Sequence, residues 1–140
     1  MEMEESRFVD LKEGDVASFS ILITDELVDG FSKVSGNQNP LHADASYAGP
    51  PYGERVAHGM LAGALFSRLI GMQLPGLYSL CLSQSLNFRK PMHIGQEVII
   101  SGAVIQKSDA TSTITLHMKA TEKDSGDILA DSEALVRVLE

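Results

Sequence analysis

The chain has one cysteine, few basic residues and no long uninterrupted hydrophobic run. The single cysteine, Cys81, cannot form an internal disulfide. We expect it to be a small buried strand residue, because a nucleophilic thiol needs an activating neighbour. Lysine and arginine number 11 against 19 acidic residues, which gives a formal net charge of −8. Since nucleic-acid surfaces need clustered basic side chains, this balance predicts no nucleic-acid partner.

No segment has the composition of a signal peptide or a membrane anchor. Residues 1–10 are acidic and have no apolar core. The longest apolar-rich stretch, residues 56–74, is interrupted by His58, Ser67 and Arg68, as is typical of a buried helix. We therefore expect a cytoplasmic protein with no membrane partner.

The order of the expected elements indicates one α+β domain over residues 1–140. This length suits a single core. A strand is expected first, then a helix that starts at Thr24 or Asp25 and ends at Gly36. A second helix, over residues 57–74, is apolar on nearly every side and is expected to be central. Period-two alternation predicts further strands at 78–88, 98–105, 113–120 and 128–138. Together they predict an antiparallel sheet of about five strands wrapped around the central helix.

A short polar loop follows the first helix and is the strongest candidate for chemistry. Gly36 ends the helical pattern, and the residue before Pro40 is pushed toward extended geometry, so His42 is expected on the loop or at its exit. Histidine exchanges protons near neutral pH and can act as a general acid or base. Alternatively, His42 closes the loop by hydrogen bonding alone. A second loop is expected over residues 48–56.

Residues 35–42 read Ser-Gly-Asn-Gln-Asn-Pro-Leu-His and resemble the signature of the MaoC-like, (R)-specific enoyl-CoA hydratases, roughly Ser-Gly-Asp-x-Asn-Pro-x-His. The match continues through residues 54–60, 65–67 and 84–88. One position departs from the pattern, because the family's catalytic aspartate is Asn37 here. The resemblance implies a hot-dog fold, a homodimer that joins its sheets, and an acyl-CoA thioester as substrate with no separate cofactor.

The same resemblance assigns roles to four residues. It implies that His42 and the residue at position 37 form the acid–base pair, that the Gly59 amide is the oxyanion donor, and that Ser67 lines the site. On the residues alone, Gly59 can equally serve close packing, and a serine in a buried helix more often bonds to its own backbone. His58, beside Gly59, is expected to cap the helix or to support the site.

Asn37 stands where the family has its catalytic aspartate, and this replacement affects the expected activity. A carboxamide keeps the shape of aspartate but has no oxygen able to take a proton at neutral pH. General acid–base assistance is typically worth about 10²–10⁴-fold in rate, so loss of one partner leaves a slow enzyme. Asp44 lies two residues after His42, but we do not expect it to act as the missing base. The asparagine is either natural or a deliberate substitution.

Basic and aromatic residues elsewhere add weaker signals. Arg89 and Lys90 are candidate contacts for the CoA phosphates, with Arg55 and Arg68 as weaker candidates; solvated surface charge is the alternative for each. Met60, among other apolar residues, fits either an acyl tunnel or ordinary core packing. No histidine has metal-ligand spacing to other ligating residues, so no metal is expected.

Three functions remain open from the sequence. The first is a hydratase or dehydratase that interconverts trans-2-enoyl-CoA and (R)-3-hydroxyacyl-CoA. The second is an acyl-CoA thioesterase, since hot-dog proteins also host hydrolysis. The third, motivated by Asn37, is a catalytically silent acyl-CoA binding protein.

Overall fold

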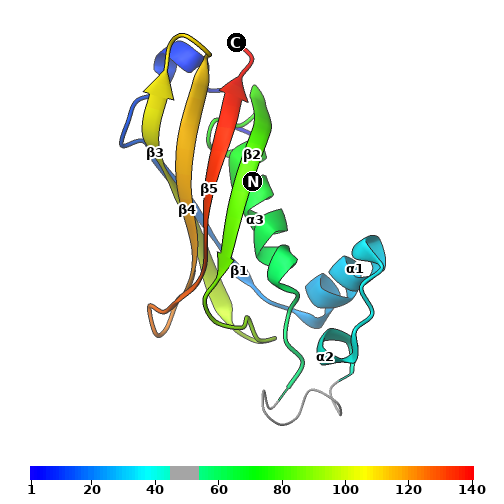
Figure 1. Ribbon diagram of the computed structural model, residues 1–140. Helices are drawn as coiled ribbons and strands as arrows, with labels where there is room; N and C mark the ends of the chain where they lie inside the picture. Colours follow the sequence, from blue (N-terminus) through cyan, green and yellow to red (C-terminus); the bar gives the residue numbers. More distant parts are fainter. Residues whose placement is uncertain (45–53) are drawn as a thin grey trace.

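The computed structural model describes residues 1–44 and 54–140, and its fold agrees with the predicted α+β class. One antiparallel sheet has the strand order β1-β3-β4-β5-β2, and the helix α3 packs against one of its faces (Figure 1). The helices α1 and α2 project to the side of α3 as a short arm. The elements are η1 (Phe8–Asp10), β1 (Val16–Leu22), α1 (Asp25–Ser35), α2 (Pro40–Ala43), α3 (Gly59–Met72), β2 (Ser79–Phe88), β3 (Glu97–Ser108), β4 (Thr113–Glu122) and β5 (Ile128–Val138).

The ends of α1 are set by local sequence, as predicted. The hydroxyl of Thr24 accepts a hydrogen bond of 3.2 Å from the Leu27 amide, which satisfies one of the free amides of the first turn. Gly36 ends the helix in the left-handed region, at φ 76°, where a residue without a side chain is favoured. The polar loop between α1 and α2 thus begins at a fixed residue, Gly36.

The loop expected around Pro40 contains a short helix, α2, that the sequence did not predict. The Asn39 side chain accepts a 3.0 Å hydrogen bond from the Leu41 amide, and Pro40 stands in the first turn. Proline suits that position because its φ is already helical and its missing amide would have no partner there. Four residues are too few for a helical period to show, so His42 lies on a helix instead of a loop. The other predicted loop, 48–56, falls mostly outside the described residues.

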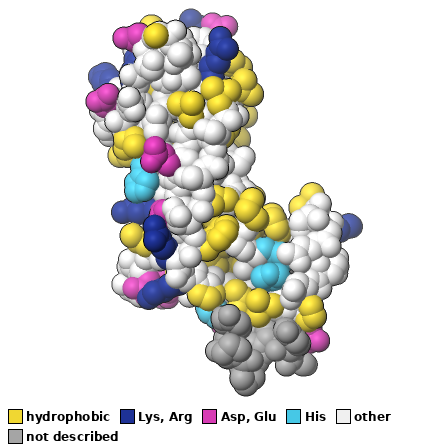
Figure 2. All heavy atoms as spheres, in the orientation of Figure 1, with side chains coloured by type: hydrophobic (Ala, Val, Ile, Leu, Met, Phe, Trp, Pro, Cys, Tyr) yellow, Lys and Arg dark blue, Asp and Glu magenta, His cyan; other side chains and the backbone are white. Residues whose placement is uncertain are grey.

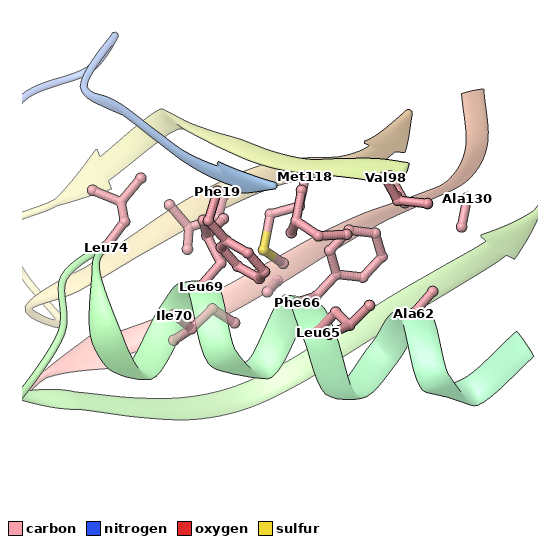
Figure 3. Close-up of a cluster of buried hydrophobic side chains, with 14 of the residues drawn as sticks. Phe19, Ala62, Leu65, Phe66, Leu69, Ile70, Leu74, Val98, Met118 and Ala130 are labelled. Atoms are coloured by element: carbon pink, nitrogen blue, oxygen red, sulfur yellow. The ribbon is translucent and has the colours of Figure 1, made fainter. Parts of the chain in front are cut away.

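The core lies between α3 and the inner face of the sheet. Phe66 and Leu69 on α3 are fully buried and lie against Val98 and Met118 from the strands (Figure 3). The buried residues of α3 face the sheet, as expected for a central apolar helix, whereas Ser67 and Arg68 on its other side are exposed. No helix within residues 1–44 and 54–140 is long and apolar enough to cross a membrane.

Two glycines give a matched test of this packing. A Cβ at Gly102 on β3 would lie 2.6 Å from Leu69 Cδ2 and 3.0 Å from Met118 Cγ, whereas at Gly71 in α3 it would meet nothing within 4 Å. Overpacking a core costs about 1–3 kcal/mol, so Gly102→Ala should lower the free energy of unfolding. Gly71→Ala should raise it by about 0.5–1 kcal/mol, because alanine favours the helix. Urea denaturation of both variants measures the difference, and equal stabilities would contradict this packing.

The edge strand β2 corrects the prediction for Cys81. That residue is exposed, because β2 pairs only with β5 and most of its side chains lie outside the core. Leu80 and Leu82 on the same strand are about half exposed. Alternation of residue types identified the strand correctly, but it does not reveal whether an apolar strand face packs within its own chain.

Candidate active site

His42 is held at the mouth of a pocket by the backbone of Val56. The Val56 amide donates to the Leu41 carbonyl (3.2 Å), and the Val56 carbonyl oxygen lies 2.6 Å from His42 Nδ1. A carbonyl oxygen only accepts, so His42 Nδ1 must carry the proton. The lone pair of the neutral imidazole is therefore on Nε2, the ring atom left to exchange a proton with a ligand.

Arg55 fixes the same helix from its other side. Its Nε donates a 2.6 Å hydrogen bond to the His42 carbonyl, and its guanidinium pairs with Asp25 (3.1 Å) and Asp29 of α1. The arginine side chain is only 13% exposed. Because these donors are engaged within the chain, Arg55 ties α2 to α1, and the weaker expectation that it contacts CoA phosphates is not supported. Arg68 lies over the Phe19 ring, at 4.3 Å, and does not line the His42 pocket.

Asn37 is exposed and forms a tight local turn. Its side-chain Oδ1 accepts a 3.1 Å hydrogen bond from the Asn39 amide. Its backbone carbonyl oxygen lies 3.0 Å from Nε2 of His58, and the His58 ring stacks on His42 with 4.0 Å between ring centroids. The structure therefore links the two residues of the expected acid–base pair through one imidazole.

Gly59 begins α3 immediately beside these groups. The first amides of a helix have no intrahelical acceptor, and the helix dipole favours negative charge there. A Cβ at position 59 would lie 3.1 Å from ring carbons of Phe88, so a side chain would crowd this end of the pocket. Both proposed uses of the glycine, close approach and an accessible amide, are consistent with its place. Its role as oxyanion donor stays a prediction.

The pocket itself has a volume of about 440 Å³ and is largely apolar. His42 and Gly59 contribute to its lining, and Figure 2 shows histidine and hydrophobic side chains together in the hollow between the arm and the body. Met60, which suited either a core or a tunnel position, is 54% exposed and lines the pocket. The other apolar lining residues are Leu41, Val56, Ala57, Ala62, Phe88, Pro91, Met92, Leu129 and Ala130.

Two basic residues complete the lining. Arg89 pairs with Asp131 (2.8 Å) and Lys90 with Asp127 (2.9 Å), and both basic side chains are 56% exposed. Hydrogen bonding to these cations lowers the pKa of Asp131 and of Asp127. The two acids stay ionised and partly balance the cations, yet the exposed cationic groups remain open to an anionic ligand at the rim.

The structure does not bring every expected site residue together. Ser67 is exposed on α3, two turns beyond Gly59, and does not line the pocket; its role stays a prediction. Gln84, in the segment 84–88 that matches the family pattern, is also exposed, and its amide donates to Ser132 Oγ (3.2 Å). His58 stands at the N-cap position of α3, but its side chain makes no capping hydrogen bond, which leaves the other expectation, that it supports the site. Its contact with Ser32, 26 residues away, had no sequence signal.

One helix embraced by an antiparallel sheet, with a histidine and a helix start meeting at an apolar pocket, is the arrangement of a hot-dog domain. The chain belongs to the MaoC like domain family, whose pattern matches residues 11–125. It is 33% identical to "3-hydroxybutyryl-CoA dehydratase" of Methylorubrum extorquens, over 94% of this chain and 83% of that protein. It is 32% identical to "(R)-specific enoyl-CoA hydratase" of Rhodospirillum rubrum, over 94% and 90%.

A solved structure shows the same fold. The unliganded R-hydratase PhaJ1 from Pseudomonas aeruginosa superposes with a TM-score of 0.93 at 31% identity, over 99% of this chain and 88% of that one. The predicted family and the predicted hot-dog fold are thereby confirmed.

Proposed function

We propose that the protein is a hydratase or dehydratase that interconverts trans-2-enoyl-CoA and (R)-3-hydroxyacyl-CoA. One observation carries the proposal: His42, with its Nδ1 proton committed to the Val56 carbonyl, lines the same pocket as the first residue of α3. A proton-exchanging nitrogen and a backbone amide are the two groups that addition of water to an enoyl thioester needs in one place. The names of the relatives support the same reaction class.

The reaction can be written with these residues. In the hydration direction the water oxygen bonds to Cβ of the enoyl group, while His42 Nε2 accepts a water proton and delivers a proton to Cα. Negative charge that develops on the thioester oxygen is met by the Gly59 amide and the positive end of α3. Asn37 can orient the water but cannot deprotonate it, so we propose a weakened rate for this sequence. The CoA thioester is the substrate, and no separate cofactor takes part.

The assay that tests this function follows the loss of enoyl-thioester ultraviolet absorbance with crotonyl-CoA. Formation of (R)-3-hydroxybutyryl-CoA supports the proposal. Release of the free CoA thiol would favour a thioesterase, and tight binding without turnover would favour a silent acyl-CoA binding protein.

Arg89 and Lys90 are proposed to contact the phosphates of CoA at the rim of the pocket. Arg89→Ala and Lys90→Ala should each raise KM several-fold for crotonyl-CoA, because exposed charge pairs contribute up to about 1 kcal/mol. KM for crotonyl N-acetylcysteamine, which has no phosphate, should stay unchanged. Lys123→Ala is the matched control: Lys123 is also half exposed and paired, with Glu97 at 3.1 Å, but it does not line the pocket. Equal effects on both thioesters would contradict a phosphate contact.

We also propose that two copies join through β2. This edge strand bears half-exposed Leu80, Leu82 and Phe88, and an uncovered apolar edge invites pairing with a second chain. Sedimentation should give about twice the 15.1 kDa chain mass. Leu82→Lys should shift the protein toward monomer, whereas Ile105→Lys on β3, where the isoleucine is equally exposed at 50%, should not. A monomeric parent protein would overturn the dimer.

A further inference from the structure

His58 is a buried polar side chain that contacts three neighbouring parts of the site around His42. It is 2% exposed. Its ring stacks on His42 from α2, with 4.0 Å between centroids and 25° between planes, and meets Phe31 of α1 at a tilt. Its Nε2 lies 3.1 Å from Ser32 Oγ and 3.0 Å from the Asn37 carbonyl oxygen. One imidazole thus contacts α1, the loop that holds position 37, and the proton-exchanging ring.

The partners of His58 define its tautomer. Because the Asn37 carbonyl oxygen can only accept, Nε2 of His58 must carry the hydrogen, which Ser32 Oγ can share. The second ring nitrogen, Nδ1, is then an acceptor, and it has no hydrogen-bond partner among the described residues. A protonated His58 would place an unpaired N–H and a charge in this buried position, which is costly.

The surrounding charges favour the same neutral form. Burial lowers the pKa of His58, and the nearby His42 and Arg55 lower it further, against the opposing effect of its hydrogen bond to the Asn37 carbonyl. The Arg55 charge is itself balanced by Asp25 and Asp29 of α1. His42 becomes a cation when it takes a proton. Because His58 is neutral, its ring can stay stacked on that cation without charge repulsion.

We propose that His58 is a positioning residue: it holds the His42 ring and the backbone at position 37 in register, and it does so as the neutral Nε2–H tautomer. The inference deepens the proposed hydratase function and rests on it. The ring touches both partners directly, and the next residue in the chain is Gly59. Displacing His58 should therefore disturb the base, the water-orienting loop and the oxyanion amide together. Misplacement of reacting groups by about 1 Å can cost about a hundredfold in rate.

Two conservative variants separate the two contacts of His58. Gln can place an N–H where Nε2 stands, so His58→Gln keeps the hydrogen bond to the Asn37 carbonyl and loses the ring stack. His58→Phe keeps the stack and loses the hydrogen bond. We expect His58→Ala to lower kcat about a hundredfold and each conservative variant to lower it about tenfold, with KM changed less than threefold. The measurements are made in both the parent chain and its Asn37→Asp form, so that the rate is high enough to follow.

A stability control distinguishes positioning from general loosening. Val28→Ala removes buried side-chain volume from α1, one turn before Ser32. The valine side chain has no polar group that could bond to His58. The variant should have a lower melting temperature with little change in kcat. If its kcat falls as far as that of His58→Gln and His58→Phe, or if His58→Ala stays within threefold of the parent, the positioning role is wrong.

A second readout needs no activity. In the parent protein, ¹⁵N NMR of the ring nitrogens should show His58 as neutral Nε2–H and His42 as a single Nδ1–H tautomer while neutral. In His58→Ala the His42 nitrogens should move toward the averaged values of a ring that exchanges tautomers. Unchanged His42 signals in this variant would overturn the inference. If the parent and its Asn37→Asp form show the expected signals but no hydration of any enoyl thioester, the proposed function fails while the placement of His42 by His58 stands.

Discussion

Asn37→Asp should raise the rate of crotonyl-CoA hydration a hundredfold or more. The structure supplies the atomic reason. In Asn37 the Oδ1 atom accepts the hydrogen bond from the Asn39 amide, which leaves the NH₂ group as the other end of the side chain. Aspartate can keep that hydrogen bond with one oxygen and offer the second as a proton acceptor, where asparagine has only a donor. A general base is worth about 10²–10⁴-fold, so the gain should appear in kcat.

Gln38→Asp provides the control for charge alone. It places a carboxylate on the adjacent exposed residue without changing the side chain at position 37. It should leave the rate within a few-fold of the parent. If the parent and Asn37→Asp hydrate crotonyl-CoA at equally high rates, the base lies elsewhere. If neither protein hydrates crotonyl-CoA, the protein is not a short-chain hydratase.

The parts of the site that the sequence predicted are those encoded within a few residues. Gly36 ended α1 because one residue determines a left-handed C-terminus, and alternation placed β2 although it could not say which side was covered. His42 is indicated by its own chemistry and by the motif of its immediate neighbours. In each case the signal lay in adjacent positions.

The parts that were missed depend on contacts between distant segments. Nothing near His58 in the sequence indicates that it stacks on His42 or meets Ser32, which lies 26 residues earlier. Arg55 looked like a free cation because its aspartate partners are 26 and 30 residues away. Exposure of Cys81 follows from the position of β2 at the sheet edge, which is a property of strand order.

His42→Asn should reduce kcat of the Asn37→Asp protein about 10²–10⁴-fold. An asparagine amide can stand where His42 Nδ1 stands and donate to the Val56 carbonyl, so the backbone contact that fixes α2 can persist. The substitution removes Nε2, the ring nitrogen whose lone pair accepts the proton. His117→Asn, on an exposed position of β4, is the control and should leave kcat unchanged. Activity that survives in His42→Asn would show that His42 does not exchange the proton.

The two substitutions should also be strongly non-additive. If position 37 and His42 divide the base and acid steps of one reaction, each is effective only when the other is present. Asn37→Asp should therefore raise kcat much less in the His42→Asn protein than in the parent. The four rates form a double-mutant cycle, and the interaction free energy that it yields should be well above zero. A full hundredfold gain from Asn37→Asp without His42 would mean that the carboxylate works alone, with the histidine only closing the turn through Val56.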